Sequence, residues 1–179
     1  MKITGPQVIS EMREKLQFDV GRHLYGVLGT YAQLTGFEET VLTQALDPRG
    51  SRYPQPTNVN RELLARIGDE DLRKLVRAEA RRPKTIQRRL GQELDNLLGE
   101  LLQGHWFVIL KQLELLFAYG LDLSVFRTRA TNQNHILLLL PGRRIGDHVT
   151  LFHEADSRFQ RAIPANLIAD NHLWELNDA

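Results

Sequence analysis

The hydrophobic pattern of the chain changes its period at Gly120, and this change constrains the fold more than any other feature. Before Gly120, apolar residues recur at intervals of three and four, the period of a helix that is buried on one face. After Gly120, several segments alternate apolar and polar residues, the period of a half-buried strand. The pattern therefore predicts a single α+β domain over 1–179, with a helical bundle at about 5–119 and a small antiparallel β-meander at about 121–179.

Helical spacing divides the N-terminal part into several stretches. Gly21 is the candidate break in the first stretch, and the last stretch is apolar on nearly all sides after Gly104, which predicts the central helix of the core. Three prolines and a glycine in Asp47–Asn58 cannot sustain a helix or a central strand, so a flexible loop is expected there. The expected helices are Pro6 to Leu34, a short helix that ends near Leu46, Val59–Ile67, Glu70–Arg81 and Lys84 to Tyr119.

Turn-forming residues divide the C-terminal part. Asn132–Asn134 and Pro141–Asp147 carry the Asn, Pro and Gly residues that favour tight turns. Strands are expected on either side of these turns, at 121–130, 135–140 and 148–155, and they would form the meander.

The composition excludes several classes of protein. The chain has no cysteine, so it contains no disulfide, no thiolate metal site and no cysteine nucleophile. Its most apolar stretch, His105–Gly120, is interrupted by Lys111 and Glu114 and falls short of the ~20 apolar residues that cross a bilayer. We therefore expect a cytoplasmic protein without membrane contact.

Cations are unevenly distributed along the chain. The net charge is only +1, yet the segment Leu72–Leu90 holds eight cations against the single acid Glu79. At 100° per residue, the apolar residues of the expected Glu70–Arg81 helix share one face, and its cations lie on the opposite face. The sequence therefore predicts an aligned basic stripe that faces solvent.

The start of the following helix extends this stripe. Lys84, Arg88 and Arg89 fall in its first two turns, where the positive end of the helix dipole disfavours cations. A helix start with free N–H groups and added arginines is, by contrast, a suitable contact for phosphate. The predicted nucleic-acid-binding residues are Arg73, Lys74, Arg77, Arg81, Arg82, Lys84, Arg88 and Arg89.

The basic stripe favours a non-enzymatic, nucleic-acid-associated accessory or regulatory protein that contacts the backbone of DNA or RNA. A purely structural interpretation is a solvated cationic face that pairs with acidic surface elsewhere. The first functional alternative is a protein-interaction adaptor or an oligomeric structural protein, in which the stripe meets an acidic protein partner or another copy of the chain.

A second functional alternative is a small hydrolase or metalloenzyme. His148 and Glu154 would share one face of the expected strand at 148–155 and could act together in acid–base or metal chemistry. The histidine spacing nevertheless lacks the i and i+4 pair of a helical zinc site, and the chain has no G-x-S-x-G motif and no glycine-rich phosphate loop. We therefore assign no catalytic residue, no metal ligand and no cofactor.

Overall fold

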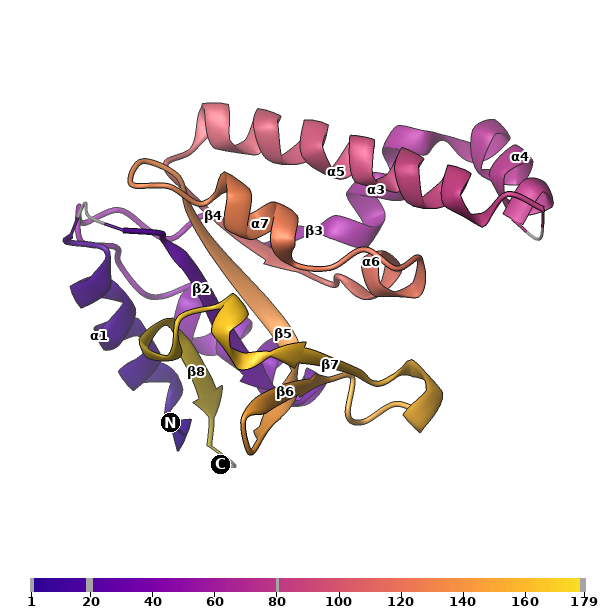
Figure 1. Cartoon of the computed structure of the whole chain (residues 1–179). Helices are drawn as coiled ribbons and strands as arrows, with labels where there is room; N and C mark the ends of the chain where they lie inside the picture. The colour runs from indigo at the N-terminus through magenta and orange to yellow at the C-terminus, as the bar shows by residue number, and fades with distance from the viewer. Residues whose placement is uncertain (1, 19–20, 80, 178–179) are drawn as a thin grey trace.

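The computed structural model describes residues 2–18, 21–79 and 81–177, and its centre is a mostly parallel β-sheet (Figure 1). The parallel strands lie in the order β1-β8-β2-β5-β4-β3, while β6 and β7 extend the far end of β5 as antiparallel strands. The strands are β1 (Lys2–Ile3), β2 (Leu24–Gly29), β3 (Thr57–Asn58), β4 (Phe107–Lys111), β5 (His135–Ile145), β6 (His148–Leu151), β7 (Arg161–Pro164) and β8 (Leu173–Leu176).

Helices cover both faces of the sheet, as a parallel sheet requires because its crossover connections place helices on its faces. The helices are α1 (Gly5–Lys15), α2 (Tyr31–Gly36), α3 (Val59–Ile67), α4 (Asp69–Glu79), α5 (Pro83–Gly104), α6 (Glu114–Ala118) and α7 (Ser124–Arg129). Shorter turns are the π-helical η1 (Phe37–Leu42) and the 3₁₀ turns η2 (Ser157–Phe159), η3 (Ala165–Leu167) and η4 (Asp170–His172).

The strands divide their side chains between two hydrophobic clusters. In β5, Ile136 and Leu138 belong to the larger cluster, which also contains buried residues of α3, α5, α6 and α7. The intervening Leu137 and Leu139 belong to the second cluster, together with residues of α1, α2 and η1. This alternation places a helical layer on each side of the sheet, in a doubly wound, Rossmann-like arrangement.

The expected α+β fold is therefore wrong, and the chain is an α/β protein in which strands and helices alternate. The expected first helix, Pro6 to Leu34, contains α1 and then β2. Leu24, Val27 and Leu28 fit helical spacing, but every residue of β2 is buried. A central parallel strand is covered on both faces and reads as a continuous apolar run, so this spacing was misleading.

The expected central helix, Lys84 to Tyr119, is wrong in its second half for the same reason. α5 ends at Gly104, and β4 and α6 follow it. The side chains are nevertheless at the centre of the protein, since Phe107, Leu110 and Leu113 are buried. Burial was thus predicted correctly, and the secondary structure was not.

The antiparallel meander is also wrong in most of its parts. The expected strand 121–130 instead contains the helix α7, and Leu123, Phe126 and Ala130 are buried at helical spacing. β5 pairs in parallel with β2 and β4, and it continues straight through Pro141. Among the named strands of the described residues, antiparallel pairing involves β6, β7 and the last residues of β5, so the expected turn at Pro141–Asp147 shortens to its final residues.

The segment Asp47–Asn58 contains the short strand β3 and an isolated antiparallel bridge between Leu46 and Arg52. The Asp47 carboxylate accepts hydrogen bonds from the backbone N–H groups of Arg49, at 2.8 Å, and Ser51, at 2.9 Å. Tyr53 is buried in the second hydrophobic cluster. The predicted flexibility of this loop stays a prediction.

Within the described residues, no helix combines the length and the apolar character that spanning a membrane requires.

Candidate functional site

The eight predicted binding residues lie on one projecting part of the molecule. Figure 1 shows α4 and the N-terminal half of α5 extending beyond the sheet, and residues 69–89 are called the basic arm below. Leu72 and Leu75 hold α4 in place because they pack, partly buried, against the larger hydrophobic cluster. Val76, which was expected on the same apolar face, is 53% exposed.

Part of the charge on the arm is neutralised locally. Lys74 forms ion pairs with Glu70, at 2.9 Å, and with Asp71, at 3.4 Å. Arg89 forms an ion pair with Glu93 at 3.1 Å, one turn further along α5. The first turn of α4 also contains the acids Asp69, Glu70 and Asp71. The arm therefore carries less net positive charge than the segment Leu72–Leu90 suggests.

Six cations remain available on the arm. Each is exposed, and the structure records no ion-pair partner within 4 Å of any of them among the residues that it describes. The first turn of α5 contains no acid, and its N-cap, Arg82, makes no capping hydrogen bond through its side chain. The six are Arg73, Arg77, Arg81, Arg82, Lys84 and Arg88.

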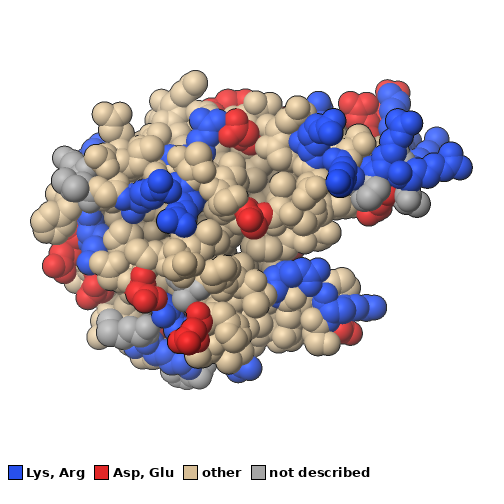
Figure 2. Space-filling model, viewed as in Figure 1, with Lys and Arg blue, Asp and Glu red and all other residues tan. Residues whose placement is uncertain are grey.

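A second group of cations lies opposite the arm. We use the name β-lobe for β6, β7 and the segment 152–160 that joins them. Figure 2 shows Lys and Arg side chains on the arm and on the β-lobe, with an open cleft between the two. Phe117 of α6 and Phe152 of the β-lobe meet edge to face, with ring centroids 5.4 Å apart. Cations therefore lie on both sides of the cleft.

Arginines and an aromatic residue form the tip of the β-lobe. Arg158 is exposed, with its Nε 3.8 Å from an Asp156 oxygen, and its guanidinium lies over the Phe159 ring at 4.7 Å. Arg161 donates to the carbonyl oxygens of Arg158 and Gln160, both at 2.8 Å. Sequence reasoning missed this wall because two isolated arginines make no charge run.

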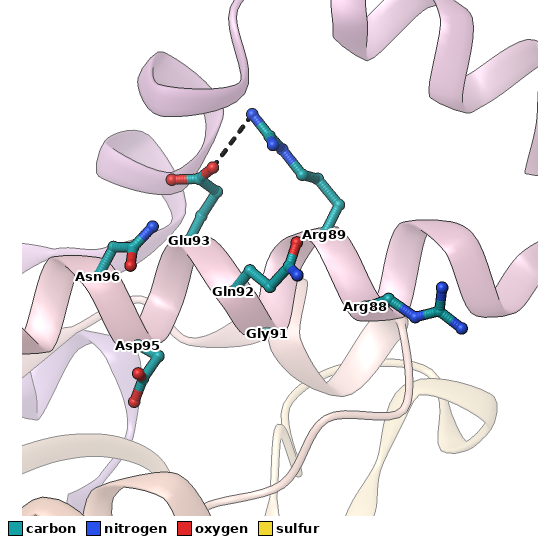
Figure 3. A pocket seen from close by; sticks show the side chains of 7 residues that line it. All are labelled: Arg88, Arg89, Gly91, Gln92, Glu93, Asp95 and Asn96. Atoms are coloured by element: carbon teal, nitrogen blue, oxygen red, sulfur yellow. Dashed lines mark ion pairs between the residues drawn. The ribbon is translucent and has the colours of Figure 1, made fainter.

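A shallow pocket on α5 carries no site. Figure 3 shows that its lining side chains all come from this one helix and point away from it in different directions. Apart from Arg88, their charges are also paired, since Arg89 contacts Glu93 and Asp95 contacts Arg129 at 2.6 Å. The lining residues are Arg88, Arg89, Gly91, Gln92, Glu93, Asp95 and Asn96.

The carboxyl ends of the parallel strands form a second candidate, because open α/β sheets bind ligands at this edge. Glu114, just after β4, accepts a hydrogen bond from the Tyr31 hydroxyl at 3.0 Å and one from the Asn60 amide at 2.8 Å. Asn60 in turn accepts from the backbone N–H of Leu115 at 3.0 Å. Burial and the Glu114 carboxylate raise the pKa of Tyr31 above its usual range, so its hydroxyl stays protonated and donates.

Neighbouring side chains extend this network along the same edge. Lys111 contacts both carboxylate oxygens of Glu38, at 2.6 and 2.8 Å, and Asn58 donates to the side chain of Gln112. Gln112 has a φ of 56°, an unfavourable conformation for a residue with a side chain. We refer to these residues, with Tyr31, Asn60 and Glu114, as the edge network; their polar groups bond mainly to one another.

The edge also lacks a phosphate-binding loop. β2 passes into α2 through the single residue Thr30, whose hydroxyl accepts from the Gln33 N–H at 3.1 Å while its own N–H donates to the Gln33 side chain at 2.7 Å. This capping box closes the helix start, and no glycine-rich segment separates strand from helix.

The structure does not bring His148 and Glu154 together on one strand face. β6 ends at Leu151, and Phe152 turns the chain with a φ of 57°. Glu154 then accepts a hydrogen bond from the backbone N–H of Tyr31 at 2.8 Å, whereas His148 pairs with Pro164 at the start of the hairpin. Among the described residues, no group of three or more acidic or histidine side chains could hold a metal ion.

Known proteins offer no guide to the site. Comparison with protein-family models, curated protein sequences and solved structures finds no match.

Proposed function

We propose that this chain is a nucleic-acid-associated accessory or regulatory protein that binds a phosphate backbone in the cleft between the basic arm and the β-lobe. The main support is the set of six exposed cations on the arm without an ion-pair partner within 4 Å among the described residues. Such cations can neutralise phosphates and release condensed counterions, which favours binding. Lys74 and Arg89 are secondary contacts, since both are already paired.

The β-lobe gives the proposed site its shape. A basic stripe on a single surface would touch only one side of a ligand, whereas Figure 2 shows cations on both sides of the cleft. Arg158 and Arg161 supply the second wall. A strand of nucleic acid in this cleft would place phosphates near both groups.

Fluorescence anisotropy with labelled duplex DNA, single-stranded DNA and single-stranded RNA, from low to physiological salt, tests the proposal. We expect the logarithm of the binding constant to fall linearly with the logarithm of the salt concentration. The double variant R81Q/R88Q should bind more weakly at low salt. Its slope should be reduced by ~0.9 for each duplex phosphate that is no longer neutralised, or by ~0.7 for each phosphate of a single strand.

The matched control removes two exposed cations elsewhere. Arg13 on α1 and Arg22 just before β2 are exposed, and α1 lies at the opposite end of the molecule from the arm (Figure 1). R13Q/R22Q makes the same change in net charge and should retain the wild-type slope. Equal effects of the two double variants, or no salt-dependent binding at all, would overturn the proposal.

The adaptor alternative predicts another outcome for the same variant. Val76 is 53% exposed beside the cations of α4, a combination that an acidic, partly apolar protein surface could cover. In that case R81Q/R88Q leaves nucleic-acid affinity unaffected but changes the native mass or abolishes co-purification with a defined partner.

A further inference from the structure

Phe159, at the tip of the β-lobe, is an exposed aromatic residue beside the proposed site. It is 54% exposed, although phenylalanine usually contributes to a core. A single exposed apolar side chain needs no explanation by itself. Phe159 differs in that hydrogen bonds hold the backbone of its loop and it lies beside the arginines of the β-lobe.

The loop that carries Phe159 is held rigidly. The N–H of Phe159 donates to the carbonyl oxygen of Asp156 at 2.8 Å, and an Asp156 carboxylate oxygen accepts from the N–H of Arg158 at 3.1 Å. The Gln160 side chain donates to the carbonyl oxygens of His153, at 3.2 Å, and Ala155, at 3.1 Å. The backbone of the loop is therefore already ordered, which reduces the ordering cost that would otherwise weaken binding.

The arginines around the ring suit the backbone of a nucleic acid. The guanidinium carbon of Arg158 lies 4.7 Å from the centroid of the Phe159 ring, and Arg161 bonds to the carbonyl oxygen of Arg158. Since the residue is 54% exposed, ring surface remains for a second planar group. An aromatic ring for a base and neighbouring cations for phosphates are the two components of single-strand binding sites.

We propose that Phe159 stacks on an unpaired base and that the cleft therefore takes single-stranded nucleic acid in preference to a duplex. This inference rests on the proposed function. In a duplex the faces of the bases are already stacked, and a base must be unpaired and unstacked to meet the ring, at a cost of a few kcal/mol. An unpaired strand has no such cost, and stacking tolerates any base sequence because every base has a π-face.

The test compares F159A with F18A in anisotropy titrations of labelled oligothymidylate, oligouridylate and a duplex. Phe18 is a matched control because it is 61% exposed and lies beyond the end of α1, away from the cleft. We expect F159A to weaken single-strand binding by roughly 5- to 150-fold, the range for one base–aromatic stack, with duplex binding nearly unchanged. The salt slope should stay at its wild-type value, because the ring contacts no phosphate.

A second variant gives a direct signal of stacking. F159W should bind at least as tightly as the wild type, and its additional indole fluorescence should be quenched by oligothymidylate. The native tryptophans are Trp174, which is buried, and Trp106, which is half-buried, so the wild type serves as the background. Thermal unfolding should show F159A and F159W folded, since the side chain contributes little to the core.

The outcomes separate this inference from the proposed function. Salt-dependent binding that R81Q/R88Q weakens, together with wild-type affinity of F159A for single strands, overturns the stacking role and leaves the basic cleft intact. Duplex binding tighter than single-strand binding overturns it as well. No binding of any probe overturns both proposals, and a selective loss in F159A together with quenching in F159W supports both.

Discussion

The edge network and the basic arm are both polar surfaces, but they use their polar groups in opposite ways. In the edge network, Glu114 accepts from Tyr31 and Asn60, and Lys111 contacts Glu38. On the arm, six cations lack an ion-pair partner within 4 Å among the described residues. The protein therefore satisfies the edge internally and leaves the arm to solvent or to a partner.

This comparison indicates where function and stability lie in the chain. Hydrogen bonds within the edge network join segments that are distant in sequence, so their loss should reduce the free energy of unfolding. Exposed cations without partners contribute little to that free energy, so their loss should affect binding alone. The predictions below test this division, ordered by their expected effect on stability.

Truncation of a buried side chain in β4, the strand that leads to the edge network, should have the largest effect on stability. Leu110 of β4 is fully buried between its neighbours Thr57 and Leu138 in the sheet. L110A should lower the free energy of unfolding by about 2–5 kcal/mol in urea titration, because it leaves a cavity. The control L64A, at a residue that is 39% exposed, should cost far less. A similar small loss in both variants would place β4 outside the core.

Removal of Asn60 should have a smaller effect on stability and none on nucleic-acid binding. Its amide group joins α3 to α6 through Glu114 and the N–H of Leu115, and N60A leaves both without this partner. We expect a loss of about 1–2 kcal/mol in the free energy of unfolding. N96A, at an exposed position on α5, is the control. If N60A is folded but no longer binds nucleic acid, the edge network contributes to binding and is a functional site.

Acidification should weaken the fold at the opposite, amino end of the sheet. Burial, and then the nearby Lys15, lower the pKa of His172 below its ordinary value of 6.5. Its ring lies 4.7 Å from that of Tyr25, centroid to centroid. The stability that the neutral ring provides is complete above pH 6.5 and is lost as the pH falls through the lowered pKa, because the unfolded chain binds the proton more readily.

Thermal unfolding between pH 7 and pH 5 measures this effect. H172Q should show a weaker dependence of stability on pH than the wild type, whereas H148Q, at an exposed position on β6, should retain it. If the stability of H172Q depends on pH as strongly as that of the wild type, groups other than His172 cause the dependence.

Features encoded within one segment were the ones that the sequence predicted well. The helix Val59–Ile67 has the expected bounds, and Asn58 caps it by accepting from the N–H of Arg61 at 3.0 Å. Its amphipathic spacing and cap are both local. The charge run of the arm is also local, but the role of its eight cations in binding stays a prediction.

Features that depend on distant segments were missed. An apolar run such as LYGVLG fits a helix or a buried strand equally well, and only its pairing with β5 and β8 decides between them. The edge network depends on that pairing, since Tyr31 and Glu114 are 83 positions apart. Polar residues directly after each apolar run are the sequence signal for the edge network. This signal can be interpreted only once the apolar runs are recognised as strands.

The spacing of charges along α4 and α5 is a further local signal, because it indicates which cations are paired. Lys74 lies four residues after Glu70, and Glu93 lies four residues after Arg89, the spacing at which helical ion pairs form. A count of charges that began at Leu72 left out the acids at 69–71, so it overstated the free charge of the arm.

The smallest expected effect on stability is that of R81Q/R88Q, the variant with a large expected effect on binding. Both arginines are exposed, and Arg88 lies near the positive end of the α5 dipole, where a cation is unfavourable. The free energy of unfolding in urea should therefore stay within about 0.5 kcal/mol of the wild-type value, while the salt slope of binding falls. R89Q serves as a contrast, because it breaks the pair with Glu93 and should cost a few tenths of a kcal/mol. If R81Q/R88Q unfolds the protein, the two arginines stabilise the fold through ion pairs of their own, and the arm is a structural feature rather than a binding surface.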